Sequence, residues 1–251
     1  MGPASPRNRR VQEAVRLQAA RGRAESGRAL LEGPNLLAEA VGAGVRVEQV
    51  FALTGDAASA QMARACSAEL ILVGEPGLRR LATTEHPQSP VAVMVIPPAE
   101  LLPAGHLLVA WGVGDPGNLG SLIRCAAAFG LGFAAGPGTA DPWAPKVLRA
   151  AAGGHFRAGA PRVELPEELR DGGRLLAATV ARGGIPPAAL PPRPLAVLVG
   201  DEAHGLPAAV VAACDLAVTI PMPGGAESLN AAVAGAIVAY EVAVRGGAAG
   251  D

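Results

Sequence analysis

The stretch "HLLVAWGVGDPGNLGSLIRCAAAFG", residues 106–130, decides the fold, because it predicts a buried strand, a glycine-rich turn and a helix in direct succession. The glycines from Gly112 onward have the G-x-G-x-x-G spacing that binds the pyrophosphate of a dinucleotide. Such a site needs backbone N–H groups in the turn and an acidic residue about 20 positions further on. Pro116 has no N–H, and Asp141 follows the next strand too late. The glycines therefore favour a tight loop over an NAD site.

Short apolar runs alternate with helical segments on both sides of this stretch. The runs lie at 28–33, 47–53, 69–74, 91–96, 106–111, 132–136, 174–180, 195–200 and 215–221, and further helices lie at 8–21, 34–42, 57–67, 76–83 and 227–245. This alternation predicts an α/β fold, and runs that are apolar on both faces predict a parallel sheet covered on both sides. The proline-rich stretch "PPAELLPAG" (97–105) predicts a small α/β domain at 1–97, a linker at 98–105 and a second domain at 106–251.

The composition is that of a globular protein, with 50% hydrophobic and 17% charged residues among 251. No apolar run approaches the ~20 residues of a membrane span, and the Arg-rich start lacks the apolar core of a secretory signal. We therefore expect a cytoplasmic protein with no membrane partner. Cys66, Cys125 and Cys214 stand far apart with few histidines nearby, which argues against a metal site and a disulfide framework.

The formal net charge of −1 provides no overall attraction for nucleic acid, but seven arginines lie within residues 1–30. Two interpretations of this segment stay open: a solvated helix face, and an arm that binds RNA phosphates. Because only 3% of the residues are aromatic, RNA binding would depend on backbone contacts and shape more than on base stacking.

Polar side chains follow three of the predicted strands. They are Asn118 and Arg124 after the first strand of the second domain, Glu202 in "LVGDEAHGLP" (198–207), and Ser228 and Asn230 in "IPMPGGAESLNAAVAGAIVAYE" (220–241). The carboxyl ends of parallel strands meet at one edge of a sheet, where ligands bind. We therefore expect these residues to form one site.

The three segments resemble motifs 1, 2 and 3 of the SpoU/TrmH group of SPOUT ribose 2′-O-methyltransferases, and the resemblance covers residues 106–246. It implies a parallel-sheet catalytic domain with a deep trefoil knot and S-adenosylmethionine as the cofactor. The matching cofactor-binding positions are Gly200, Ile220 and Leu229, with Met222 and Thr179 as neighbours. Residues 1–97 resemble the small ribosomal-protein-like RNA-binding domain often attached to these enzymes, mainly through Arg28, Glu32, Gly33 and Asn35.

The reaction that the resemblance implies is methyl transfer from a sulfonium to a ribose hydroxyl. Arg124 matches the family arginine proposed as the base, but a guanidinium is normally protonated. Two roles therefore stay open for Arg124: an unusual base, or a cation that binds phosphate and stabilises the developing oxyanion. Asn118 and Glu202 match residues that shape the active site. Ser228 and Asn230 match the motif 3 pair, and Ser228 is also predicted to cap the last helix.

The resemblance also implies an RNA substrate, with ribosomal RNA favoured over tRNA, and a homodimer formed through the helix at 229–244. The candidate RNA contacts are Arg9, Arg10, Arg23, Arg28, Glu32, Asn35, Lys146 and Arg149. One departure from the family lies in "KVLRAAAGGHF" (146–156), where Ala151 to Gly154 replace the usual Ser-Gly-Ala and remove a hydroxyl.

Three other functions stay open. They are a catalytically silent RNA-binding or assembly protein on the same scaffold, a tRNA-directed 2′-O-methyltransferase, and an NAD-dependent oxidoreductase. The complete set of polar motif residues argues against the silent protein, and the poor fit of the glycine turn argues against the oxidoreductase.

Overall fold

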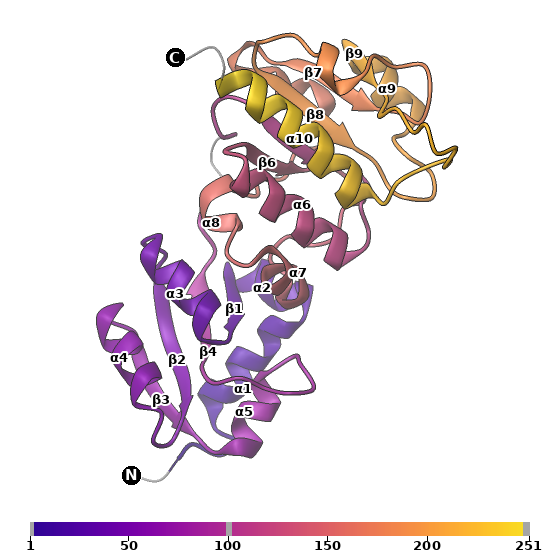
Figure 1. The fold of residues 1–251 in the computed structure, drawn as a ribbon. Coiled ribbons are helices and arrows are strands. Elements are labelled where there is room, and N and C mark those ends of the chain that lie inside the picture. The colour runs from indigo at the N-terminus through magenta and orange to yellow at the C-terminus, as the bar shows by residue number, and fades with distance from the viewer. Residues whose placement is uncertain (1–2, 99–101, 248–251) are drawn as a thin grey trace. The chain divides into compact units, whose positions relative to one another are not determined.

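The computed structural model describes residues 3–98 and 102–247 (Figure 1). The chain divides into two compact units, one made of Met1–Pro98 with Trp143–Phe156, and the other of Ala99–Pro142 with Arg157–Asp251. The first unit thus includes a short segment that the sequence places in the second domain. The functional division at 98–105 stays a prediction.

The first unit contains a mixed sheet with the strand order β1-β4-β2-β3. Its strands are β1 (Arg28–Glu32), β2 (Val47–Leu53), β3 (Glu69–Val73) and β4 (Val91–Val95). β4 runs antiparallel to β1 and β2, whereas β2 and β3 run parallel. Its helical segments are α1 (Arg9–Val15), the 3-10 turn η1 (Arg16–Gln18), α2 (Ala20–Ser26), α3 (Pro34–Gly42), α4 (Ala57–Ala65), α5 (Glu75–Leu81) and α7 (Pro145–Ala151).

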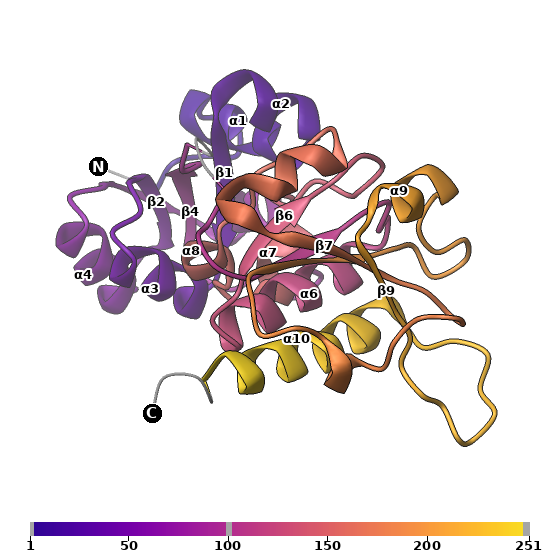
Figure 2. The same ribbon diagram turned by 90° about the horizontal axis from the view of Figure 1, so that it is seen from above.

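Helices cover both faces of this sheet because successive strand residues point to opposite sides. Leu30 packs with residues of α1, η1 and α5, whereas Leu31 packs with residues of α3, α4 and α7. Figure 2 shows α1 and α2 on one side of the strands and α3 and α4 on the other. Leu148 of α7 is fully buried in the second of these cores, so the segment Trp143–Phe156 completes the first unit.

The single helix predicted at 8–21 is wrong. The chain forms α1, η1 and α2 instead, with Ala19 in an extended conformation (φ −91°, ψ 144°). The chain reverses tightly at this point, since a Cβ on Gly22 would lie 2.1 Å from the carbonyl oxygen of Arg16. Only glycine fits there.

The second unit contains a five-stranded sheet with the order β6-β5-β8-β7-β9, and every pair of neighbouring strands is parallel, as predicted. The strands are β5 (Leu107–Ala110), β6 (Gly132–Ala135), β7 (Leu175–Thr179), β8 (Leu195–Val199) and β9 (Leu216–Val218). The helical segments of this unit are α6 (Pro116–Ala128), η2 (Pro166–Gly173), η3 (Pro187–Ala189), α9 (Ala208–Ala213) and α10 (Ala231–Gly247), and α8 (His155–Ala158) contains the division between Phe156 and Arg157.

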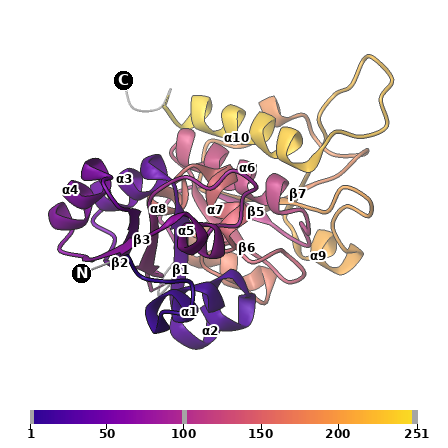
Figure 3. The same cartoon turned by 90° about the horizontal axis from the view of Figure 1, so that it is seen from below.

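α10 lies alongside α6 and also contacts β8 (Figures 1 and 3). Gly235 permits this close approach, because a Cβ there would lie 2.3 Å from Leu122 Cδ2. α9 contributes to the core on the side of the sheet that includes Leu176 and Leu198.

Within residues 3–98 and 102–247, every helix is too short or too polar to cross a membrane.

Candidate active site

A cavity of about 490 Å³ opens at the carboxyl ends of β7, β8 and β9. Its walls come from the loops after these strands and from the start of α10, including the long segment between β9 and α10 that is visible in Figures 2 and 3. All five residues predicted to bind the cofactor line this cavity: Thr179, Gly200, Ile220, Met222 and Leu229. The topology therefore brings together loops that are distant in sequence.

The loop after β8 is a tight turn. The N–H of Gly205 donates to the carbonyl oxygen of Asp201 at 2.9 Å, and these two residues form an isolated bridge. A Cβ on Gly200 would lie 2.3 Å from the carbonyl carbon of Gly205. Glycine is therefore required at position 200, where it lets the two sides of the turn meet at the wall of the cavity.

Three of the predicted catalytic residues are joined by hydrogen bonds. The Asn118 side-chain amide donates to Glu202 Oε1, and Asn230 Nδ2 donates to Asn118 Oδ1 at 2.9 Å. Asn118 is held in turn by the helix start, because its backbone N–H donates to Asp115 Oδ1 at 2.8 Å. The network links α6, the loop after β8 and the start of α10, as the sequence predicts for one site.

The predicted cap of the last helix is wrong. Asn230, not Ser228, caps α10, since Asn230 Oδ1 accepts from the N–H groups of Ala232 at 2.9 Å and Val233 at 3.2 Å. The helix begins at Ala231, four residues later than expected, because the glycine- and proline-rich loop before it continues through Ser228. Ser228 lines the cavity.

Arg124 lies on α6 and is exposed. Within the part of the chain that the structure describes, its guanidinium has no hydrogen bond or ion pair to protein, so it does not join the network around Asn118. An exposed, permanently charged guanidinium is suited to binding phosphate or another anion.

The cavity suits a cofactor that carries positive charge and an apolar ring system. The carboxylates of Asp201, Glu202 and Glu227 line it together with the apolar side chains of Ile220 and Leu229. Carboxylates would attract the sulfonium and ammonium groups of S-adenosylmethionine, and the apolar side chains would cover its adenine. The residues present therefore fit this cofactor.

Three of the arginines predicted to contact RNA are paired with carboxylates of the first unit. The pairs are Arg9 with Glu13 at 2.8 Å, Arg10 with Glu69 at 2.5 Å, and Arg28 with Glu48 at 2.6 Å. The pairs of Arg9 and Arg10 are exposed and contribute little stability, so a phosphate could replace the carboxylate there, whereas the pair of Arg28 is partly buried. Asn35 and Lys146 are exposed at the first turns of α3 and α7.

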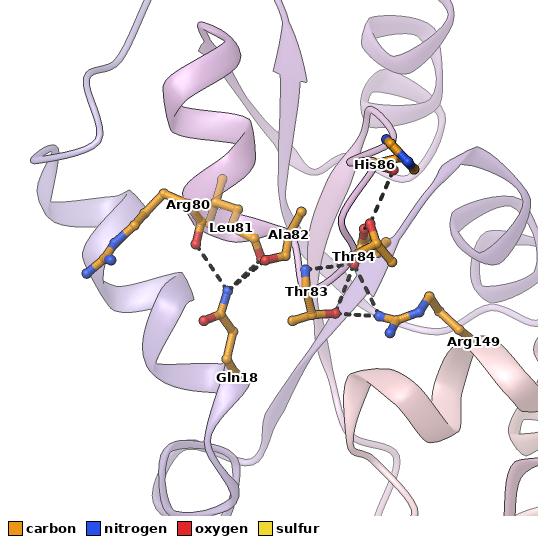
Figure 4. Close-up of polar contacts among 9 residues, drawn as sticks. Gln18, Arg80, Leu81, Ala82, Thr83, Thr84, His86 and Arg149 are labelled. Atoms are coloured by element: carbon orange, nitrogen blue, oxygen red, sulfur yellow. Dashed lines mark hydrogen bonds and ion pairs between the residues drawn. The ribbon is translucent and has the colours of Figure 1, made fainter. Parts of the chain in front are cut away.

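Arg23 differs, because only 4% of it is exposed. Its guanidinium donates to the carbonyl oxygens of Leu17 at 2.8 Å and Gln18 at 2.9 Å. Gln18 in turn donates to carbonyl oxygens at the end of α5, as Figure 4 shows. The burial of Arg23 favours a structural role over the predicted RNA contact.

Glu32 and Arg149 bind each other at 3.2 Å within the first unit. The Glu32 carboxylate also accepts from the backbone and hydroxyl of Thr83, both at 3.0 Å, and from the hydroxyl of Thr84. Figure 4 shows Thr83, Thr84 and Arg149 converging on this point. Since 6% of the Glu32 side chain is exposed, the geometry again favours a structural role.

The comparisons with known proteins agree with this geometry. The chain belongs to the SpoU rRNA methylase family, whose model matches residues 105–240, more than half of the chain. Residues 8–92 match the MRM3-like substrate binding domain. The predicted family is therefore confirmed.

Relatives and solved structures match nearly the whole chain. The 23S rRNA (guanosine(2553)-2′-O)-methyltransferase of Bacillus subtilis is 34% identical over 95% of this chain and 97% of that protein. The SpoU methyltransferase AviRb of Streptomyces viridochromogenes, solved with AdoMet, has a TM-score of 0.86 at 29% identity over 95% of this chain and 98% of that chain. An AdoMet-bound rRNA methyltransferase from Sinorhizobium meliloti has a TM-score of 0.84 at 26% identity over 95% of each chain. These similarities confirm the predicted α/β fold, with a parallel-sheet catalytic domain and an N-terminal substrate-binding domain.

The sequence did not single out three residues that line the cavity: Asp201, His204 and Glu227. The first two share the loop of Glu202, and this proximity was the signal that could have identified them.

Across residues 3–98 and 102–247, no group of three or more His, Cys, Asp or Glu side chains could hold a metal ion.

Proposed function

We propose that the protein transfers the methyl group of S-adenosylmethionine to a ribose 2′-hydroxyl of ribosomal RNA. The observation that carries the proposal is the network of Asn118, Glu202 and Asn230, which links three loops beside a cavity suited to this cofactor. The similar Bacillus subtilis protein is named as a 23S rRNA 2′-O-methyltransferase, which supports ribosomal RNA as the substrate.

The cofactor, when bound, supplies an electrophilic methyl group on a sulfonium. Gly200, Ile220 and Leu229, with Thr179 and Met222, would hold the adenosyl part through backbone groups and apolar contact. A cofactor held by these residues would supply its methyl group at the carboxyl edge of the sheet. Alignment of donor and acceptor is the main contribution that such a site makes to the rate.

The polar residues position the ribose. Asn118 holds the carboxylate of Glu202 in place, and Ser228 provides a hydroxyl in the same cavity. Arg124 acts as a cation that binds an RNA phosphate and stabilises negative charge on the 2′-oxygen as its proton leaves. This role uses the guanidinium in its ordinary protonated form.

The first unit binds RNA through exposed basic and polar groups. We assign the contacts to Arg9, Arg10, Arg28, Asn35 and Lys146, which lie at the surface. Arg23, Glu32 and Arg149 support the unit instead, because each is held by protein partners, Arg23 is buried, and 6% of the Glu32 side chain is exposed.

We further propose a homodimer formed through α10. An apolar stripe on this helix is exposed, with Val233 48%, Ile237 36%, Tyr240 52% and Val244 52% accessible. These positions follow the spacing of one helical face, and a stripe of this kind is typical of a surface that packs against a partner. The family resemblance implies that the partner packed against this stripe is a second copy of the chain.

A knotted C-terminal segment is also part of the proposal. After β9, at the edge of the sheet, the chain returns to the middle, where α10 contacts α6, β8 and η3. Arg245 Nη1 donates to the carbonyl oxygen of Leu190 at 3.0 Å, which fixes α10 against the η3 segment. Contacts of α10 with β8 and with η3 support a chain that passes beneath the loop after β7.

The bacterial rRNA methyltransferases among the relatives support a cytoplasmic location.

The test is methyl transfer from radiolabelled S-adenosylmethionine to protein-free 23S rRNA, 16S rRNA and tRNA, with the ribose methyl group mapped by its resistance to alkaline cleavage. We expect a single methylated ribose in ribosomal RNA. Asn118→Ala should lower the rate by about 10²-fold or more, because misplaced reacting groups cost that much, while cofactor affinity stays within about threefold. A protein that binds RNA and cofactor but methylates no RNA would support the silent alternative, and labelled tRNA alone would support a tRNA enzyme.

A further inference from the structure

A second cavity, of about 170 Å³, lies at the amino ends of β5 and β8, across the sheet from the candidate active site. Its walls come from His106 at the start of β5, from the proline-rich segment 190–195 before β8, and from Val242 and Arg245 on α10. Among the described residues, the two cavities share no lining residue, and the length of β8 separates them by about 15 Å. The proposed mechanism gives this second cavity no role.

The two arginines of this cavity carry permanent positive charge and are exposed. Arg193 Nη2 donates to the carbonyl oxygen of Gly173 at 3.2 Å, and Arg245 Nη1 donates to that of Leu190 at 3.0 Å. These bonds hold each guanidinium in place and leave its other N–H groups for a ligand. Within residues 3–98 and 102–247, neither arginine forms an ion pair with a carboxylate of the protein.

The imidazole of His106 supplies a further donor. The backbone N–H of Leu195 donates to His106 Nδ1 at 3.3 Å, so the hydrogen of the neutral ring lies on Nε2. Burial, together with the positive charge of Arg174, lowers the pKa of His106, so the ring is neutral at pH 7. Arg174 is 4% exposed and donates to the carbonyl oxygen of Gly105 at 2.6 Å. A buried cation therefore adds to the positive potential around the cavity.

The polar side chains of the described cavity wall, those of His106, Arg193 and Arg245, present donors to a ligand, so the ligand must supply acceptors and negative charge. A guanidinium matches a phosphate group through two parallel N–H···O bonds. Prolines at 191, 192 and 194 restrict the backbone that carries Arg193, which lowers the entropy lost on binding. A water molecule takes about 30 Å³ of the liquid, so a cavity of 170 Å³ has room for the five heavy atoms of phosphate.

We propose that this cavity binds a phosphate group, which is either a phosphate of the RNA backbone or a free phosphate anion. Arg193 binds its oxygens from the proline-rich segment, Arg245 binds them from α10, and His106 Nε2 donates to another oxygen. The site is independent of the methyl transfer proposed above, because it lies at the other edge of the sheet. Only the assignment to RNA rests on the proposed function, and it would extend the RNA contacts to the second unit.

The experiment is a titration of the wild-type protein with inorganic phosphate near neutral pH at constant ionic strength, followed by calorimetry and by nitrogen NMR of the His106 ring. We expect saturable binding with a Kd of about 1 mM or tighter, and a shift of the Nε2 signal. Arg193→Gln and Arg245→Gln should each weaken the affinity by about tenfold, because each removes a hydrogen bond to a charged group.

Arg162→Gln is the matched control. Arg162 is another exposed arginine of the second unit that donates to a carbonyl oxygen, that of Ala140 at 3.3 Å, and its loss should leave the affinity for phosphate unchanged. Arg193→Gln, in an exposed segment, keeps the test independent of any effect of Arg245 on the position of α10. The affinity for S-adenosylmethionine should stay within about threefold in every variant, which checks that the fold is intact.

A second titration, with protein-free 23S rRNA, distinguishes the two sources of phosphate. If the cavity binds the RNA backbone, Arg193→Gln should lower RNA affinity and its dependence on salt, whereas Arg162→Gln should not. If it binds free phosphate, the same variants should change phosphate affinity alone. Phosphate binding that does not saturate, or that the variants and the control change alike, indicates an adventitious ion only and overturns the site. A wild type that binds phosphate here and methylates no RNA overturns the proposed function but not this site.

Discussion

Replacing Glu32 by Gln tests whether this residue supports the first unit or contacts RNA. The carboxylate accepts from Arg149, from Thr84 and twice from Thr83, and 6% of its side chain is exposed. Removing one partner of a buried ion pair costs about 3–5 kcal/mol. Because 30% of the Arg149 side chain is exposed and can be rehydrated, we expect about 2–3 kcal/mol here. At about 4 °C per kcal/mol for a unit of this size, the melting temperature should fall by about 8–12 °C.

The assay is thermal and urea unfolding followed by the fluorescence of Trp143, which lies in the first unit, in a background where Trp111 of the second unit is replaced by Phe. A cycle of Glu32→Gln, Arg149→Gln and the double variant should give a coupling energy of about 1–3 kcal/mol, since the two side chains touch. Glu25→Gln is the control: this carboxylate is 63% exposed in its pair with an arginine, and its loss should cost less than about 1 kcal/mol.

The result that would refute this reasoning is a Glu32→Gln variant with the stability of the wild type and weaker RNA binding. Glu32 would then contact RNA, as the sequence predicts. A stability loss without coupling to Arg149 would instead show that the threonine contacts carry the effect.

Three further perturbations test other parts of the structure. Gly200→Ala should abolish cofactor binding in calorimetric titration, because its Cβ would lie 2.3 Å from the carbonyl carbon of Gly205; near-normal affinity would contradict the tight turn. Arg170 donates to Asp215 at 2.8 Å and holds the pKa of that carboxyl below its usual range. The stabilisation is therefore present above about pH 4 and is lost as the pH falls through the lowered pKa, so the unfolding free energy of the wild type should decline more steeply in acid than that of Asp215→Asn. Ile237→Glu should convert the proposed dimer into a monomer in light scattering, and a monomeric wild type would argue against the α10 interface.

Much of the fold could be predicted because local patterns determine it. Runs such as 195–200 are apolar on both faces, and the corresponding strand β8 lies inside the parallel sheet with every residue buried. The candidate site followed from the same pattern, since polar residues placed just after parallel strands meet at one edge. This pattern was sufficient to predict that Asn118, Glu202 and Asn230 lie together, and the structure joins them by hydrogen bonds.

The structural features that the sequence did not predict depend on packing between segments that are distant in the sequence. Leu148 is an ordinary apolar helix residue, and nothing in its local sequence indicates that it is buried in the first unit. Arg23 resembles the exposed arginines around it, and its burial becomes possible only because carbonyl oxygens at the end of η1 accept its N–H groups. The break near Ala19 has no proline, and the available signal was Gly22, whose lack of a side chain permits the reversal.

Asn230 connects the candidate active site to the start of the last helix. Its Oδ1 accepts from the first N–H groups of α10, while its Nδ2 donates to Asn118. Rotation of the amide by a half turn would break both sets of bonds, so the cap fixes the direction in which Nδ2 points. The same helix carries the exposed apolar stripe proposed as the dimer contact. Packing of that stripe against a second copy would therefore hold the helix start in place, and with it the residues that align Glu202.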